Sequence, residues 1–287
     1  MTTQQSSATT TSAAHFAALH APGNPLVVPN IWDLSSLNTV LSLNSSSSPS
    51  SPTTVSPPVK AVATASYAIA ESLGLADADL SLGANLIRIS QLAPRVRAAG
   101  LPLTVDIQDG YGDRLDEVVA AVVKAGAVGA NVEDMREDGG LWSCEEQVER
   151  LKRVMRVAAG NGCDGFVVNA RCDVMSPASK RDGSAGEEGR LLDETVRRGK
   201  KYLEAGATTV FVWGGPRGLR DAEVRTLARE FEGRLAVKLA ATGENVLSVR
   251  ELADIGVARI SVGPSLYLAA HKTVREAAER IVGGGRL

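Results

Sequence analysis

Short apolar runs alternate with amphipathic stretches along most of the chain. Between the apolar runs, apolar residues recur at helical spacing, as in DEVVAAVVKAG, and several of these stretches end in Ala-Gly or Ile-Gly, a common helix end. The apolar runs predict eight strands, at Leu26–Pro29, Ala61–Ser66, Leu103–Gln108, Gly129–Asp134, Gly165–Arg171, Thr208–Trp213, Leu235–Leu239 and Ala258–Val262. Eight strand–helix units predict an α/β fold, a (β/α)8 TIM barrel. A doubly wound sheet is the alternative, but no GxGxxG follows the first strand.

Two stretches depart from this pattern and set the expected domain boundaries. Residues 1–20 predict a flexible N-terminal segment, with a polar, disordered part over 1–12 and a weak helix after it. Residues 45–58 are rich in Ser and Pro, which predicts an exposed loop insertion, because such a composition offers little to bury. The rest, residues 21–287, is expected to form a single barrel domain.

Composition excludes several classes of protein. Of the 287 residues, 31 are Lys or Arg and 33 are Asp or Glu, so the balance of charge does not suggest a nucleic-acid binder. No apolar run approaches the roughly 20 residues of a membrane span. The three cysteines are too few and too irregular for a disulfide framework, which favours a reducing compartment, with the cytoplasm expected and an organelle as the alternative.

Histidine limits the possible chemistry. The three histidines are His15, His20 and His271, and none lies between residues 21 and 270. A Ser-His-Asp or Cys-His arrangement and a His-ligated metal are therefore not expected. Catalysis would have to use carboxylates, Lys, Arg, Tyr, backbone amides or a hard metal ion bound through oxygen.

Polar side chains gather at the predicted carboxyl ends of the strands, where TIM-barrel enzymes carry their active sites. Carboxylates from the third and fourth strand, with water, suit Mg²⁺ or Mn²⁺, and a guanidinium from the fifth strand suits a carboxylate ligand. Each residue alone has a structural explanation, as a loop cap or a rim ion pair. In chain order the strand-end residues are Asp33, Ser66, Asp106, Gln108, Glu133, Asp134, Arg171, Asp173, Trp213 and Lys238.

The motifs at these strand ends resemble one family. PNIWD, ATASYAIAESLGLAD, VDIQDGYG, NVED, NARCD and RISVGP, in this order and spacing, are similar to the isocitrate lyase/phosphoenolpyruvate mutase superfamily, and most of all to its small phosphonomutase-like branch. The resemblance covers about residues 20 to 270. It implies a (β/α)8 barrel, Mg²⁺, and a small carboxylate substrate that passes through an enolate. It also implies a homo-oligomer, a tetramer or dimer, whose C-terminal helix is often swapped between subunits.

The resemblance also implies roles for single residues. Asp106 and Glu133 match metal-site carboxylates, and Gln108 occupies a third metal-site position where the family usually has Asp or Glu. Asp77 matches an acidic residue near the water shell of the metal. The substrate carboxylate is expected at Ser66, Tyr67 and Ala68 and at the substrate-binding Arg171. From its place at the first strand end, Trp32 is expected as a wall of the pocket, with packing at the barrel rim as its alternative role.

The general acid is left open. Lyases of the family carry a Lys-Lys/Arg-Cys-Gly-His signature after the residue that Glu133 matches, whereas this chain has DMREDGGLWSCEEQ. Cys144 in that stretch is better interpreted as a helix start, because neighbouring glutamates disfavour a thiolate. The remaining candidates are Tyr67, Asp109, Tyr111 and Asp134. Tyr111 is the preferred one, directly after the metal strand, with packing of the turn as its alternative role.

Together these observations predict an Mg²⁺-dependent enzyme that acts on a small α-keto or α-hydroxy carboxylate through an enolate. Cleavage of a carbon–carbon bond, as in isocitrate lyase or an oxaloacetate hydrolase, is the first expectation. The alternatives are a carbon–phosphorus enzyme, either a phosphonomutase or a phosphonopyruvate hydrolase, and a non-catalytic carboxylate-binding member of the family.

Overall fold

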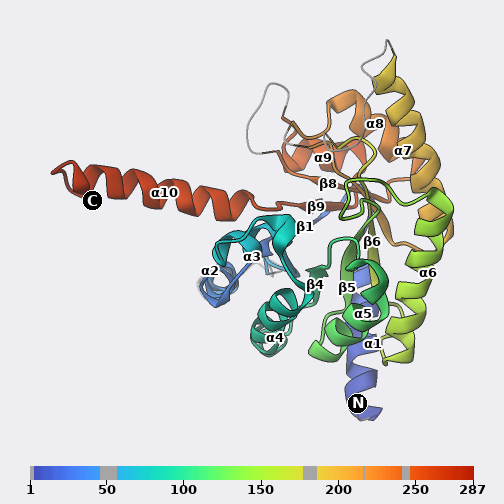
Figure 1. The fold of residues 1–287 in the computed structure, drawn as a ribbon, viewed down its shortest axis with the longest axis horizontal. Helices are drawn as coiled ribbons and strands as arrows, with labels where there is room; N and C mark the ends of the chain where they lie inside the picture. Colours follow the sequence, from blue (N-terminus) through green and yellow to red (C-terminus); the bar gives the residue numbers. More distant parts are fainter. Residues whose placement is uncertain (1–2, 46–56, 177–185, 216, 241–245) are drawn as a thin grey trace, which may run out of the picture.

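Nine parallel strands form a barrel at the centre of the molecule (Figure 1). The structure, a computed structural model, describes residues 3–45, 57–176, 186–215, 217–240 and 246–287. The strands follow one another around the sheet in the order β1-β9-β8-β7-β6-β5-β4-β3-β2. They are β1 (Leu26–Val28), β2 (Asn30–Ile31), β3 (Val62–Thr64), β4 (Leu103–Asp106), β5 (Gly129–Glu133), β6 (Val167–Cys172), β7 (Thr209–Val212), β8 (Leu235–Lys238) and β9 (Arg259–Ser261).

The first predicted strand, Leu26–Pro29, is observed as β1, and a second short strand that was not predicted, β2, follows directly after Pro29. Together β1 and β2 bond to both neighbours in the barrel. β1 pairs with β9, with Leu26 opposite Arg259, and β2 pairs with β3, with Asn30 opposite Ala63. Pro29 lies between the two pieces and has no N–H to continue a ladder, but its carbonyl accepts a hydrogen bond of 3.0 Å from the Ala63 amide. The other seven predicted strands are present within one to two residues at each end, so the TIM-barrel prediction is confirmed.

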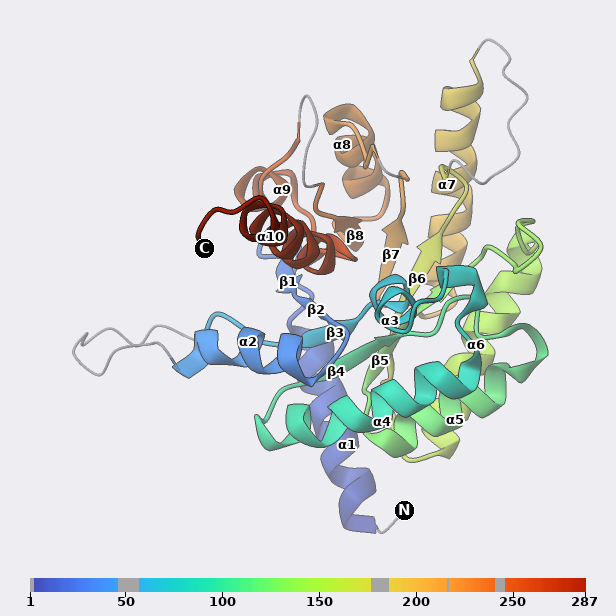
Figure 2. The same ribbon diagram turned by 60° about the vertical axis from the view of Figure 1, so that its left-hand side comes forward.

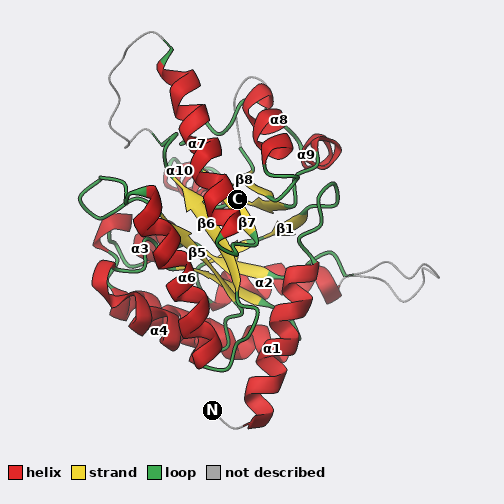
Figure 3. Ribbon diagram, turned by 90° about the vertical axis from the view of Figure 1, so that its right-hand side faces the viewer, coloured by secondary structure: helices red, strands yellow, loops and turns green. Residues whose placement is uncertain are grey.

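Helices surround the strands (Figure 3). α5 illustrates how the sequence forms them: Val118, Val119, Val122 and Val123 make one buried stripe, and the helix ends at Gly126 with a φ of 108°. The helices of the outer layer are α2 (Leu34–Ser45), α3 (Ser66–Ser72), α4 (Leu82–Ala98), α5 (Leu115–Ala125), α6 (Cys144–Gly160), α7 (Glu187–Glu204), α8 (Asp221–Glu230) and α9 (Val249–Ile255), with short 3-10 helices at Asp77–Asp79 and Gly112–Arg114.

A layer of buried polar side chains fills the middle of the barrel and shows which strand residues point inward. Asn169 donates to Asn131 Oδ1 at 2.8 Å, and Thr209 donates to Asn169 Oδ1 at 2.7 Å. Arg259 reaches the same Asn131 oxygen at 3.3 Å from the far side of the barrel. Because side chains alternate along a strand, residues two positions after these also face the interior, at the carboxyl end.

The N-terminal segment differs from the sequence prediction, which expected flexibility over residues 1–20. A single helix, α1 (Thr3–Ala18), begins well before Ala13, and Ala13 and Phe16 are fully buried. The Phe16 ring lies against Gly129, the first residue of β5, where an added Cβ would approach the ring to 3.0 Å. The Arg259 guanidinium lies 6.0 Å from the centre of the same ring. α1 therefore closes the amino end of the barrel, which a local sequence pattern could not reveal.

The C-terminal helix α10 (Ser265–Val282) projects away from the barrel (Figures 1 and 2). Among its residues only Tyr267 is buried, while Val274 and Val282 are largely exposed. The Ser/Pro-rich insertion predicted at 45–58 lies almost wholly outside the described residues. No helix in the described ranges is long and apolar enough to cross a membrane.

Candidate active site

The carboxyl ends of β4, β5 and β6 bring together the acidic and basic side chains that the sequence singled out. Glu133 lies opposite Arg171 in the ladder, and an NH1 hydrogen of Arg171 bonds to the Glu133 carboxylate. Nε and NH2 of Arg171 both donate to Asp173 Oδ1, at 3.0 and 2.9 Å. The guanidinium also lies 4.6 Å from the ring centre of Trp213. Arg171 is thus held by two carboxylates and an indole, which fixes its orientation at the barrel mouth.

Asp106 ends β4 and is tied to the start of α3. Its Oδ2 accepts from the amide and the hydroxyl of Ser66, at 3.4 and 3.3 Å, and its Oδ1 accepts from the Gln108 amide at 3.3 Å. Its own N–H donates to Thr64 Oγ1 at 2.9 Å. The end of β4 and the start of α3 are therefore linked by hydrogen bonds. These bonds join Asp106, predicted for the metal, to Ser66, predicted for the substrate.

Asp77 joins this group through Gln108. Gln108 has a φ of 52°, and its Nε2 donates to the carbonyl of Asp77 at 2.8 Å and to the Asp77 carboxylate at 3.4 Å. Burial raises the pKa of Asp77, and the negative charge of Asp106 raises it further. Loop residue Asp77, 29 positions before Asp106, thus lies beside the strand-end carboxylates as the sequence predicted.

The site carries more negative than positive charge. Burial raises the pKa of Glu133 well above its usual range; Arg171 opposes this shift, whereas Asp173, Asp106 and Asp77 add to it. Burial likewise raises the pKa of Asp173 to about 6. Four clustered carboxylates around one guanidinium are costly, and a divalent cation would relieve that cost.

Hard oxygen donors of this kind fit Mg²⁺ or Mn²⁺. Among the described residues no three Asp, Glu, Cys or His side chains are close enough to enclose an ion by themselves. Mg²⁺ usually keeps several of its waters, so one or two carboxylates, with Asp106 and Glu133 as the candidates, would suffice.

The residues predicted for the substrate carboxylate lie at the start of α3. Ser66 and Ala68 are buried, and Tyr67 is partly exposed. Trp32 packs on Ala65 and Ala68 and makes an edge contact with Tyr267, with ring centres 5.3 Å apart. Trp32 therefore contacts the α3 segment and the first turn of α10.

Tyr111 is positioned by the turn that follows β4. Its φ is 56°, and its hydroxyl accepts a hydrogen bond of 2.8 Å from Asn85. The same Asn85 amide donates to the Asp106 carbonyl at 3.0 Å. Burial raises the pKa of Tyr111, which makes the phenol a weaker acid. This geometry favours the packing role that the sequence left open for Tyr111.

The other two carboxylate candidates for the acid have structural partners. Asp109 Oδ1 accepts from the amides of Tyr111 and Gly112, at 2.8 and 3.4 Å, and so caps the turn. Asp134 points away from the barrel interior, because it follows the inward-facing Glu133. It accepts from the Asp173 amide at 2.8 Å and from the Tyr202 hydroxyl at 2.7 Å.

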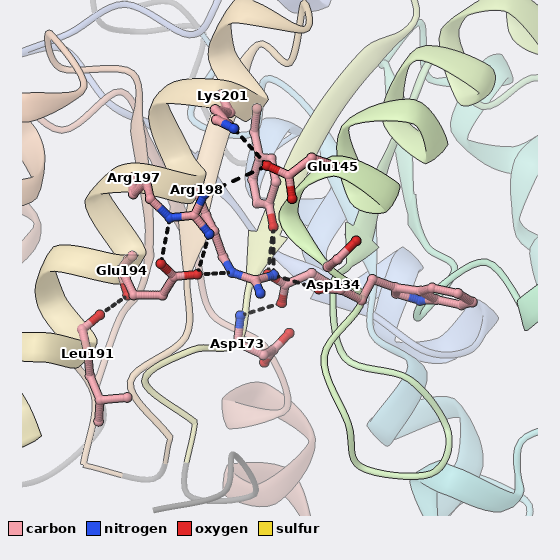
Figure 4. A network of polar contacts seen from close by, with 12 residues as sticks. Asp134, Glu145, Asp173, Leu191, Glu194, Arg197, Arg198 and Lys201 are labelled. Atoms are coloured by element: carbon pink, nitrogen blue, oxygen red, sulfur yellow. Dashed lines mark hydrogen bonds and ion pairs between the residues drawn. The ribbon is translucent and has the colours of Figure 1, made fainter.

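Asp134 belongs to a buried polar network between the barrel and α7 (Figure 4). Arg198 of α7 donates to Asp134 at 3.2 Å, to the Trp142 carbonyl at 2.8 Å and to Glu194 at 2.7 Å. By holding the Asp173 amide, the network fixes the residue that orients Arg171. Sequence reasoning missed this support. Its signal is the spacing of Glu194, Arg198 and Tyr202, which places them one helical turn apart on one face.

Cys144 is the first residue of α6, and its role is structural. Ser143 and Glu146 form a reciprocal capping box at this helix start, as their hydrogen bonds of 3.1 and 3.0 Å show. The thiol is buried, and burial raises its pKa, so it carries little thiolate character.

We expect Cys144→Ser to keep kcat within about threefold of the wild-type value, because a buried thiol with little thiolate character takes no part in proton transfer or nucleophilic attack. Steady-state turnover on the active substrate measures this. A fall of a hundredfold or more, about 2.7 kcal/mol of barrier, would mean that this loop carries lyase chemistry after all.

Comparisons with known proteins identify the family of the chain. The family model for phosphoenolpyruvate phosphomutase matches residues 16–282. The chain is 28% identical over 274 residues to an uncharacterized protein of Mycobacterium tuberculosis, covering 95% of this chain and 90% of that protein. It is 31% identical over 148 residues to a probable 2-methylisocitrate lyase of Corynebacterium glutamicum, covering 50% of this chain and 45% of the lyase.

Solved structures show the same architecture. A crystal structure of a Burkholderia cenocepacia J2315 protein, provisionally named a phosphonomutase, superposes with a TM-score of 0.78 and 31% identity, covering 96% of this chain and all of that one. Oxaloacetate acetylhydrolase shares the fold, with a TM-score of 0.74, 19% identity, and coverage of 94% and 86%. The chain is therefore an enzyme of the phosphoenolpyruvate phosphomutase family, in the isocitrate lyase/phosphoenolpyruvate mutase superfamily of lyases and mutases.

Proposed function

We propose that the protein is a divalent-metal-dependent lyase that cleaves a carbon–carbon bond in a small α-keto or α-hydroxy carboxylate. The observation that carries this proposal is the group of Asp77, Asp106, Glu133 and Asp173 around Arg171 at the barrel mouth. Anionic substrates need a cation beside them, and carboxylates in excess need a metal to balance them. Relatives with named carbon–carbon lyase activity, such as the 2-methylisocitrate lyase, support the choice of bond.

Each group in the site has a distinct task in this proposal. A bound Mg²⁺ or Mn²⁺ would stabilise negative charge that develops on the ligand when the bond breaks. Arg171 binds the substrate carboxylate with whichever N–H groups its own partners leave available, and Glu133 and Asp173 keep its plane fixed. The Ser66–Ala68 segment receives the same carboxylate from the opposite side, and Trp32 supports that segment.

A side-by-side assay tests the proposal. Purified protein with Mg²⁺ is offered oxaloacetate, 2-methylisocitrate and phosphonopyruvate, and product formation is followed with and without EDTA. We expect metal-dependent turnover of one of the first two. Metal-independent turnover, or no turnover of any of them, would contradict the proposed function.

A carbon–phosphorus reaction is the second candidate. It is favoured by the match of the phosphomutase family model across residues 16–282 and by the full-length likeness to the Burkholderia protein. The loop after Glu133 also lacks the lyase signature. Turnover of phosphonopyruvate alone in the same assay would select this reaction.

We propose further that the protein assembles as a homotetramer in which α10 packs on a neighbouring subunit. The helix projects from its own barrel with apolar side chains exposed, among them Leu268, Val274 and Ile281. Such a surface is costly in water unless something covers it. We expect light scattering to give a tetramer for the wild-type chain and a smaller species after Val274→Asp. A monomeric wild-type protein would contradict this proposal.

A further inference from the structure

Three groups considered above as the acid of the reaction are held in structural positions. Tyr111 accepts a hydrogen bond from Asn85, and Cys144 is a buried helix start. Asp134 faces α7, outside the barrel interior. His20 is partly buried beside Phe16 at the amino end of the barrel, and this burial lowers its pKa to about 4. None of these groups combines an available proton with a place on the interior face.

Lys238 does lie on the interior face, at the carboxyl end of β8. Arg259 points into the barrel, as its bond to Asn131 shows, and Ala236 is its ladder partner on β8. Lys238 follows Ala236 by two residues and pairs with Ser261, so both side chains face the interior one layer higher. Arg171 faces the interior by the same alternation from Asn169, and its ladder partners lead through Phe211 to Ala236, two residues before Lys238. The charge of Arg171 acts on Lys238 from two strands away, so both side chains lie at this end of the barrel interior.

The ammonium group of Lys238 has no hydrogen-bond or ion-pair partner among the described residues. Lys238 is partly buried, and within the described residues it forms no ion pair and no hydrogen bond. Its stem packs on Gly263, where an added Cβ would lie 3.4 Å from the lysine Cε. The neighbouring residue Ser261 is 2% exposed, and its hydroxyl group has no hydrogen-bond partner in the described residues. Two adjacent polar groups without partners indicate a site where a polar ligand supplies the missing hydrogen bonds.

The other charged groups beside Lys238 are already paired. Lys238 lines a cavity of about 500 Å³ together with Arg217, Arg220 and Asp221. Arg217 bonds to Glu223 at 2.9 Å, Arg220 bonds to Glu188 at 2.7 Å, and Asp221 bonds to Arg225 at 2.9 Å. From β6, Arg171 faces Lys238 with a like charge. No carboxylate in the described residues therefore neutralises Lys238.

We propose that Lys238 is the general acid of the reaction and protonates the enolate carbon after bond cleavage. This assignment rests on the proposed function. When the bond β to the carboxylate breaks, its electron pair stays on one fragment as an enolate. The other fragment leaves as a carbonyl compound: carbon dioxide from a keto acid, or an oxo acid from a hydroxy acid whose hydroxyl proton passes to water. One N–H of the ammonium then gives its proton to the enolate carbon, which forms the C–H bond of the product and leaves a neutral amine. The amine takes a proton from water before the next turnover.

The electrostatic environment suits this task. Burial lowers the pKa of Lys238, and the charge of Arg171 lowers it further, which brings the ammonium closer to the range where it transfers a proton readily. A positioned general acid contributes about 10² to 10⁴ in rate. Because the acid must be protonated, activity should fall on the alkaline side at a lower pH than the ordinary value of 10.5 for lysine.

Two substitutions separate proton donation from charge. Lys238→Met removes both, and Lys238→Arg keeps the charge but donates a proton poorly. For both variants we expect kcat to fall at least a hundredfold and the alkaline limb of the pH profile to disappear. Binding of the probe oxalate in the presence of Mn²⁺, measured by calorimetry, should stay within about fivefold of wild type for Lys238→Arg. Lys124→Met, at an exposed position on α5, is the matched control.

Other results would contradict the assignment, and each would indicate a different role for Lys238. Wild-type kcat in Lys238→Met, or full recovery of kcat in Lys238→Arg, would show that no proton comes from Lys238. A raised KM and weakened oxalate binding with kcat intact would make Lys238 an anion-binding residue instead. Loss of oxalate binding and of the thermal transition in both variants would make its role structural. A wild-type protein that turns over none of the three substrates overturns the proposed function, and this assignment with it.

Discussion

Arg171→Met is expected to abolish turnover and to destabilise the fold. At neutral pH the free energy of unfolding should fall by about 3–5 kcal/mol, because the substitution leaves Glu133 and Asp173 buried without their cation. The loss should shrink as the pH is lowered, since protonation removes the uncompensated negative charge, and it should be largest above the raised pKa values of these carboxyls. Urea unfolding at several pH values, with kcat/KM on the active substrate, measures both effects.

Two further variants separate the structural from the catalytic role of Arg171. Arg171→Lys keeps the charge but loses the planar fork, so most of the stability should return while turnover stays at least a hundredfold below wild type. Arg153→Met breaks an exposed ion pair with Asp116 and should cost about 1 kcal/mol or less. Normal turnover in Arg171→Lys would show that the guanidinium does not hold the substrate.

Metal binding is expected to depend on Asp106 far more than on Gln108. Asp106→Asn removes a negative charge but keeps the side-chain shape that Ser66 contacts, and we expect Mn²⁺ affinity to fall by about 100-fold. Gln108→Ala should change the affinity by less than about tenfold, because an amide is a weaker ligand for hard cations. Calorimetric titration with Mn²⁺ compares the variants directly.

Gln108→Glu provides the opposite test. The amide donates to the carbonyl and the carboxylate of Asp77, so a glutamate there would add charge beside Asp77 as well as beside Asp106. If this group of residues binds the metal, the added charge should tighten Mn²⁺ binding at neutral pH. Unchanged Mn²⁺ affinity in both Asp106→Asn and Gln108→Glu would place the metal elsewhere.

Much of the site could be predicted from the sequence, because in a barrel the position of a residue along its strand determines whether it lies near the mouth. Apolar runs locate the strands, and the polar residue at the end of each run then lies at the mouth. Asp106, Glu133 and Arg171 lie together for that reason, as predicted. The side on which each residue lies follows from alternation along the strand. Glu133 therefore lies inside the barrel and Asp134 outside it, although the two are adjacent at one strand end.

The pairing of distant strands and the packing at the ends of the barrel could be seen only in the tertiary structure. Pro29 separates β1 from β2, which bond to different neighbours, and only the arrangement of all the strands in the barrel shows why a short break is tolerated there. Phe16 is buried because residues distant in sequence, Gly129 and Arg259, lie around its ring, so α1 packs on the barrel through Ala13 and Phe16.

The chain by itself thus determined the order of strands and helices, the residues at the strand ends and the family, since these depend on local periodicity and spacing. The tertiary structure decided which charges are neutralised. Arg171 is held by Glu133 and Asp173, Asp134 is held by Tyr202 and Arg198, and Lys238 has no partner in the described residues. Charge pairing depends on distances of a few ångströms between strands and helices that are remote in sequence, and no local pattern encodes those distances.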